Sequence, residues 1–356
     1  MTSLLVLTIS ITVLALILIT VHFLLLFSTP EPLQTDPSER LFTTSPRTTP
    51  ARLPSLFDEP TLKLSVIVPA YNEDDRLGIM LDEAMEYFQS PSSEGLRREG
   101  VEVLVVDDGS SDGTARTAQD LSDKWATKGE GVEIRVVRLR ENRGKGGAVQ
   151  HGVMHSRGRL ISFADADGAT RFSDLDLLLA ALEQVQQDEQ GMVVGSRAHL
   201  VKSEAVVKVT PKPTHARIPP LSTNPRRPGH PRYAMWIQGE QDFPYVLETG
   251  ANLVPLRKLF TRPTARLLFP DLHLPRWSFD VELLLLASLI VPPIPVREVA
   301  VAWHEVNGSK IRLGWDSIGM ARDLLVLRGN LAIGRWLVPK LRADHVNGVK
   351  LEEKGR

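Results

Sequence analysis

Five short apolar runs alternate with helical stretches between residues 62 and 196, and this alternation limits the fold more than any other feature of the chain. The runs are KLSVIV (63–68), VEVLVV (101–106), VEIRVVRL (132–139), RLISFA (159–164) and MVVGS (192–196). Strands separated by helices pair in parallel, because each helix carries the chain back to the start of the next strand. We therefore predict an α/β fold with a Rossmann-like, mostly parallel sheet and helices on both faces.

Helices are expected in the intervals between these strands, and short polar residues mark where two of them begin. We place the helices at 75–89, at 112–128, from Gly146 onward and at 173–190. Ser111 or Asp112 would cap the second helix and Ser173 the fourth, because their side chains accept hydrogen bonds from free amides of the first turn.

Polar motifs follow the first four strands directly. They are PAYNEDD (69–75), DDGSSDGT (107–114), ENRGKGG (141–147) and DADG (165–168). Open α/β sheets bind ligands at the carboxyl edge of their strands. Four polar loops that meet at this edge predict a ligand site, and the competing interpretation is four ordinary solvated turns.

The DADG loop indicates a metal, because Asp165 and Asp167 are two residues apart and point to the same side of an extended segment. Two neighbouring carboxylates repel each other unless a cation lies between them or one of them is protonated. Hard oxygen ligands suit Mg²⁺ or Mn²⁺, so we predict that Asp165 and Asp167 bind one of these ions. A solvated turn is the alternative, since Asp and Gly both favour turns.

Several classes of protein are excluded by what the chain lacks. The first loop has neither G-x-G-x-x-G nor the Walker sequence, which argues against a dinucleotide-binding domain and a nucleotidyltransferase. Lys and Arg number 42 and Asp and Glu number 43, so no overall field attracts nucleic acid. The chain has no cysteine, which excludes disulfides and thiolate metal sites.

The N-terminal residues predict a membrane anchor. Residues 4–27 carry no charge apart from a possible one on His22 and are long enough to cross a bilayer as a helix. A cleaved signal peptide, the alternative, would have a basic start and a shorter apolar core. We predict a transmembrane anchor over 1–28, a Pro-, Ser- and Thr-rich linker over 29–61, a catalytic domain over 62–335 and a C-terminal tail over 336–356.

The motifs together resemble a known enzyme family. VIVPAYNE, VVDDGSSDGT, NRGKGGAVQHG and FADADGAT resemble, in this order and spacing, the family-2 inverting glycosyltransferases with the GT-A fold. NRGKGGAV, GSRAHL, RWSFDVE and VAWHEVNGSK are similar to the branch of that family that glucosylates dolichyl phosphate. The resemblance covers roughly residues 62–208 and 259–330 and implies UDP-glucose and dolichyl phosphate as substrates.

The resemblance also implies roles for individual residues. Asp165 and Asp167 would bind the metal that bridges the diphosphate, and with Lys310 they form the expected catalytic set. Acceptor and phosphate contacts would come from Arg197, His304 and Lys310, although His304 stands where related mannosyltransferases carry an Arg. The expected donor-binding residues are Pro69, Tyr71, Asn72, Glu73, Asp107, Asp108, Lys145 and Ala166.

The implied setting is the endoplasmic reticulum membrane, with a single membrane span, the catalytic domain facing the cytosol and contact with membrane lipid. Three alternatives are weighed against this interpretation. A GDP-mannose-dependent transferase disagrees with GSRAHL and VAWHE, and a processive polysaccharide synthase would carry Gln where His273 stands before Arg276 and Trp277. The third alternative is a membrane-tethered GT-A protein that binds its donor without turnover.

That third alternative rests on residues ~209–258, which contain many prolines and no helical periodicity. Family members carry a membrane-facing segment here and then a stretch like RDTQCGFKLF, of which this chain has only Leu259-Phe260. The forced codons of Met235-Trp236 encode Cys-Gly when shifted by one nucleotide. We hypothesise that this segment is a frame-shifted exon followed by a translated intron, which predicts a disordered insert and weak activity. A genuine lineage-specific loop is the alternative.

Overall fold

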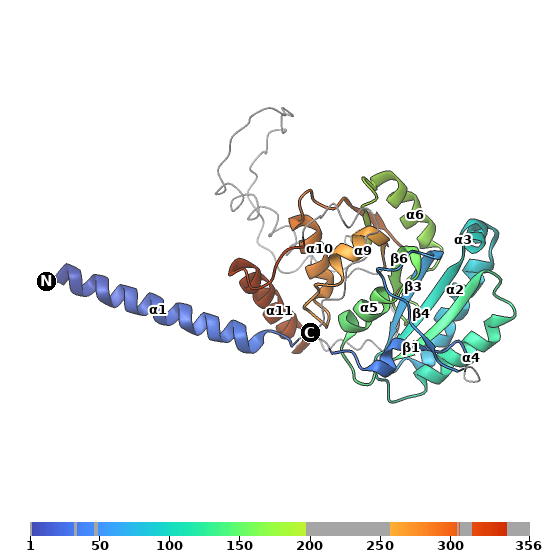
Figure 1. The fold of residues 1–356 in the computed structure, drawn as a ribbon, viewed down its shortest axis with the longest axis horizontal. Coiled ribbons are helices and arrows are strands. Elements are labelled where there is room, and N and C mark those ends of the chain that lie inside the picture. The colour runs from blue at the N-terminus through green and yellow to red at the C-terminus, as the bar shows by residue number, and fades with distance from the viewer. Residues whose placement is uncertain are drawn as a thin grey trace, which may run out of the picture.

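The central feature of the fold is a seven-stranded sheet in the order β5-β4-β3-β6-β8-β7-β9 (Figure 1). The computed structural model describes residues 2–31, 34–45, 49–196, 257–304, 306 and 315–339. All strands of this sheet run in one direction except β8, which is antiparallel to both β6 and β7. The predicted mostly parallel α/β sheet is therefore confirmed. The strands are β3 (Leu62–Ala70), β4 (Val101–Asp107), β5 (Val132–Arg138), β6 (Gly158–Ala164), β7 (Met192–Ser196), β8 (Arg257–Thr261) and β9 (Val296–Ala300).

Helices cover both faces of the sheet because the strands are apolar on both sides. In β3, Val66 and Val68 face one buried cluster, while Ile67 between them faces the other. The first face carries α2 (Asp74–Gln89), α4 (Thr114–Ala126) and α6 (Asp174–Val185), and the second carries α5 (Lys145–Met154), α9 (Arg262–Leu268) and α10 (Phe279–Leu289). The short helices η2 (Pro91–Ser93) and α3 (Glu94–Glu99) lead into β4.

Two details of the predicted helices are wrong. The fourth helix ends at Val185, well before residue 190, because residues Gln187 and Gln190 pair through their backbones in a tight turn. Ser173 makes no capping side-chain bond. The second helix begins at Thr114, whose amide donates to Asp112 Oδ1 at 3.0 Å.

The N-terminal helix α1 (Thr2–Ser28) is continuous over 27 residues and projects away from the sheet (Figure 1). Helix α11 (Trp315–Ala332) packs against its C-terminal end, where Asn330 Nδ2 donates to Thr29 Oγ1 at 3.2 Å. In the part of the chain that the structure describes, no helix combines the length and apolarity needed to cross a membrane. The predicted transmembrane anchor is not confirmed.

Much of the predicted linker over 29–61 is folded onto the domain. It contains η1 (Pro37–Arg40) and a small antiparallel sheet of β1 (Leu41–Phe42) and β2 (Ala51–Arg52). Leu53 and Leu56 are buried in the same apolar cluster as α5. The composition suggested a tether, but burial of these two leucines fixes the segment against the domain.

The predicted insert over ~209–258 falls almost entirely outside the described residues, so its conformation stays a prediction. Its C-terminal boundary is wrong, because Arg257 and Lys258 belong to β8 and are fully buried. Lys258 lies opposite Phe163 of β6, and Arg257 lies opposite Ala164. Pairing with β6 thus brings the end of the segment into the sheet.

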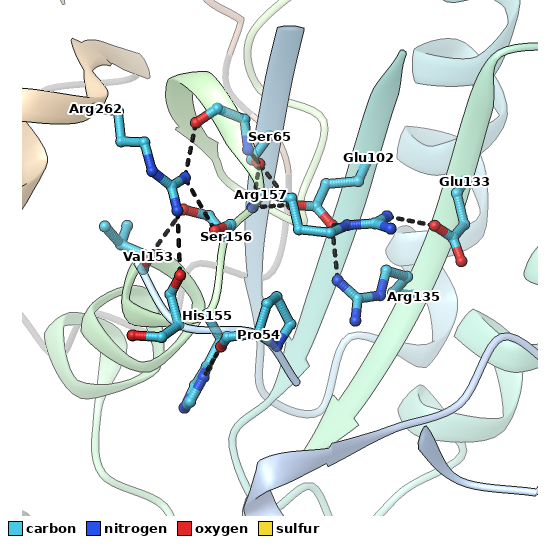
Figure 2. Close-up of polar contacts among 12 residues, drawn as sticks. Pro54, Ser65, Glu102, Glu133, Arg135, Val153, His155, Ser156, Arg157 and Arg262 are labelled. Carbon is cyan, nitrogen blue, oxygen red and sulfur yellow. Dashed lines mark hydrogen bonds and ion pairs between the residues drawn. The ribbon is translucent and has the colours of Figure 1, made fainter. Parts of the chain in front are cut away.

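A buried polar network lies near the amino ends of the strands, opposite the predicted ligand edge (Figure 2). Glu102 of β4 accepts from Arg135 Nη1 at 2.8 Å, from Arg157 Nε at 2.9 Å and from Ser65 Oγ at 2.5 Å. Burial favours the neutral acid, but Arg157 and Arg135 outweigh it and lower the pKa of Glu102. These buried charges pair with one another at the edge opposite the polar loops, so we assign them to the stability of the fold and look for the site at the carboxyl edge.

Candidate functional site

The loops after β3 and β4 are joined by hydrogen bonds. The amide of Asn72 donates to Ser110 Oγ at 2.9 Å, and Asn72 Oδ1 accepts from the amide of Ser111 at 2.9 Å. The amide of Glu73 donates to Thr114 Oγ1 at 2.7 Å. Asn72 has a φ of 51°, a left-handed conformation that Asn tolerates better than most residues. The first two predicted ligand loops therefore form one rigid unit.

Asp108 joins the β4 loop to the β5 loop. Its two carboxylate oxygens accept from the amides of Arg143 at 2.8 Å and Gly144 at 2.9 Å. Gly109, with a φ of 68°, lies so close to this loop that a Cβ would be 2.9 Å from the backbone of Glu141. Burial raises the pKa of Asp108 to about 6, even though both amides favour the carboxylate.

Asp107, the last residue of β4, is fully buried and turned toward its own loop. Its Oδ1 accepts from the amide of Ser110 at 3.0 Å, and its Oδ2 lies 3.3 Å from Arg138 Nε. These contacts fix the turn that presents Asp108.

Lys145 joins the β5 loop to the DADG loop. It is the first residue of α5, and its Nζ lies 2.6 Å from Asp165 Oδ1. Burial by itself would lower the pKa of Lys145, but Asp165 and then Asp280 outweigh it, so the pKa is raised and the side chain is charged. A fixed cation and a carboxylate thus face each other at the carboxyl edge of β6.

The two aspartates of the DADG loop differ in their contacts. Asp167 Oδ1 accepts from the amide of Ala169 at 3.0 Å, which shapes the turn, while Asp165 contacts Lys145. Ala166 between them is buried. No group of three or more acidic or His side chains suited to a metal occurs among the described residues. This donor set fits Mg²⁺ or Mn²⁺, because such ions use one or two carboxylates and take further oxygens from phosphates and water.

The predicted site residues gather on one edge of the molecule as far as the structure describes them. All eight predicted donor-binding residues lie at the carboxyl ends of β3, β4, β5 and β6 or between these ends and the first residue of the following helix. His304 is exposed beside the DADG loop, where its amide donates to Ala169 O at 3.1 Å. Arg197 and Lys310 lie outside the described residues, so their predicted phosphate contacts stay predictions.

The sequence interpretation missed a buried ion pair below this edge. Lys258 Nζ lies 2.5 Å from Asp280 Oδ1, and both side chains are buried. Burial lowers the pKa of Lys258 to about 8. Asp280 lies in the first turn of α10. The RWSFDVE stretch marks Asp280 in the sequence, but nothing local identifies its partner Lys258, which lies 22 residues earlier.

Glu282, also in the first turn of α10, holds the loop at residues 273–274, which lies next to the site. Its carboxylate accepts from the amides of His273 at 3.0 Å and Leu274 at 2.8 Å. The loop that it holds presses on the β5 loop, since a Cβ on Gly146 would lie 2.8 Å from Leu274 O. Only glycine fits at position 146, and this close contact restricts the backbone conformation next to Lys145.

Comparisons with known proteins were made against this geometry. The sequence profile of "Glycosyl transferase family 2" matches residues 65–229. Dolichyl-phosphate beta-glucosyltransferase of Drosophila melanogaster is 40% identical over 291 residues, which are 81% of each chain. The human protein of the same name is 37% identical and covers 82% of each chain. The structure of glucosyl-3-phosphoglycerate synthase from Mycobacterium tuberculosis with uridine-diphosphate is 18% identical, with a TM-score of 0.44 over 76% of this chain and 80% of that chain.

Proposed function

Since the chain belongs to the dolichyl-phosphate β-glucosyltransferases of glycosyl transferase family 2, we propose that it transfers glucose from UDP-glucose to dolichyl phosphate. The products are UDP and dolichyl β-D-glucosyl phosphate, a glucose donor for assembling the lipid-linked oligosaccharide of N-glycosylation. The proposal is carried by four polar loops that meet at the carboxyl edge of the sheet and are linked through Asp108 and the Lys145–Asp165 pair, in a GT-A-like fold whose relatives bear this name.

The reaction is a single displacement with inversion. An oxygen of the lipid phosphate forms a bond to the anomeric carbon as the bond from that carbon to the UDP β-phosphate oxygen breaks. The acceptor is already anionic at neutral pH, so the enzyme needs no general base to activate it. An α-linked donor therefore gives a β-linked product.

The residues of the chain hold the leaving diphosphate and the nucleotide. Lys145 is charged and sits at the start of α5, where it can donate to a phosphate oxygen. Asp108 keeps the β5 loop closed beneath the nucleotide. A divalent metal held by Asp165 and Asp167 would supply Lewis-acid stabilisation of the departing diphosphate.

We also place the enzyme in the endoplasmic reticulum membrane with its catalytic domain in the cytosol. Helix α1 carries no charged residue in its first or last turn, and apolar side chains such as Ile9, Leu16 and Phe23 are exposed along it. A helix that is apolar on all sides favours a lipid environment. Dolichyl phosphate is itself a membrane lipid, so attachment brings the enzyme to its acceptor.

The test is a transfer assay with the purified full-length chain in detergent. UDP-[¹⁴C]glucose and dolichyl phosphate should give a radioactive, organic-soluble product that mild acid hydrolyses to glucose. GDP-[¹⁴C]mannose, the donor of the main alternative, should give none. Incorporation from GDP-mannose alone, or from neither donor, would contradict the proposal.

A further inference from the structure

The segment that joins α1 to the sheet is fastened to the domain at several of its described residues. We call its residues 34–45 and 49–58 the strap. At its C-terminal end, Arg262 Nη2 donates to the carbonyl of Asp58 at 2.9 Å. His155 Nδ1, which Figure 2 shows beside the strap, lies 2.6 Å from the carbonyl of Pro54. The C-terminal end of the strap is therefore held by Arg262 of α9 and by His155, which follows the last residue of α5.

Glu39 is the point at which the strap meets the β5 loop. Its side chain is only 1% exposed and forms an ion pair with Arg143, which is 10% exposed. Its Oε1 accepts from the amide of Arg140 at 2.9 Å, and its Oε2 also accepts from the amide of Asp36 at 2.8 Å. Its carbonyl lies 2.9 Å from His151 Nε2 of α5. Because both side chains are buried, water cannot easily take the place of the Glu39 carboxylate beside Arg143 if that charge is removed.

Arg143 transmits this contact to the donor site. Its side chain is held from outside by Glu39, while its own amide and that of Gly144 donate to Asp108. The next residue, Lys145, pairs with Asp165. The β5 loop is thus fixed between the strap on one side and the donor-binding carboxylates on the other.

We propose that Glu39 is a positioning residue of the donor site, which through Arg143 holds the backbone of residues 142–145 in the conformation that binds the nucleotide. The inference rests on the proposed function. It also gives the strap a task in the reaction, since the strap lies in the chain between α1, the proposed membrane attachment, and the sheet that carries the donor loops.

The test is isothermal titration of the full-length chain in detergent with UDP and Mn²⁺. Glu39→Gln keeps the shape but removes the charge that pairs with Arg143, and its single carbonyl oxygen can accept from only one of the two backbone amides that Glu39 binds. We expect UDP to bind roughly 10-fold to 100-fold more weakly, the range seen for groups that orient a ligand-binding residue. The KM for UDP-glucose should rise while the KM for dolichyl phosphate stays unchanged. Asp36→Asn is the matched control, since it removes a charge from the same strap at an exposed pair with Arg140 and should bind UDP as the wild type does.

Two further measurements separate positioning from stability. Amide hydrogen exchange at Arg143 and Gly144 should be faster in Glu39→Gln, and in an Arg143→Met background the Glu39→Gln change should have no further effect on UDP affinity. Wild-type affinity and exchange in Glu39→Gln, or a loss confined to the melting temperature, would overturn the proposal. If the wild type itself fails to bind UDP, the proposed function fails, and the exchange rates at 143–144 still decide whether Glu39 orders the loop.

Discussion

Two neighbouring cations in β8 should respond in opposite ways to the same substitution. Arg257 is 1% exposed, and its three guanidinium nitrogens have no hydrogen-bond partner among the described residues. It stacks on Phe172 at 4.1 Å. Lys258 is equally buried but pairs with Asp280 at 2.5 Å. We predict that Arg257→Met stabilises the folded protein and that Lys258→Met destabilises it.

The magnitudes follow from the burial of each charge. Burial lowers the pKa of Arg257 from 12.5 to about 10, which corresponds to roughly 3 kcal/mol against the charged form. Stacking on Phe172 returns about 1–2 kcal/mol, so Met, which fills similar space, should gain about 1–2 kcal/mol. Removing Lys258 leaves the buried Asp280 without its directly bonded cation and with only the Coulombic attraction of Lys145, a loss of about 3–5 kcal/mol.

Thermal unfolding of the full-length chain, followed by tryptophan fluorescence, measures both effects. For a domain of this size about 1 kcal/mol moves the melting temperature by 2–4 °C, so Arg257→Met should raise it by roughly 2–8 °C. Lys258→Met should lower it by roughly 6–20 °C. A fall for Arg257→Met as large as that for Lys258→Met would show that the Arg257 guanidinium is paired in the folded protein, and the reasoning would be refuted.

Three other predictions concern the site and the membrane. Asp167→Asn should reduce glucose transfer by roughly 100-fold or more without lowering the melting temperature, and EDTA should do the same to the wild type; full activity in EDTA would contradict the metal. Burial raises the pKa of Asp108 from 3.8 to about 6, so the folded state holds this proton more tightly than the unfolded chain does. The free energy of unfolding should therefore fall as the pH rises from about 4 to about 6, and Asp108→Asn should remove that contribution in urea titrations; an unchanged slope would count against it. Residues 1–28 should hold the protein in the pellet after alkaline carbonate extraction, whereas release of a chain beginning near residue 29 would indicate a cleaved signal.

Sequence reasoning reached the fold because the relevant information is local. Each apolar run records that a strand is buried on both faces, and the helices between runs dictate parallel pairing. Parallel strands end at one edge of a sheet, so the predicted topology by itself brings Asp108, Lys145 and Asp165 together. Composition misled in the strap, where the apolar residues are few and Leu53 and Leu56 sit among prolines and threonines.

What only the tertiary structure decided are contacts between residues far apart in the chain. The reversed strand β8 lies between β6 and β7, and no periodicity in residues 257–261 announces that order. The Glu39–Arg143 pair spans 104 residues, and Lys258 of β8 pairs with Asp280 of α10. The sequence around a charged side chain does not identify its partner, because the pairing depends on which helices and strands the packed core brings together.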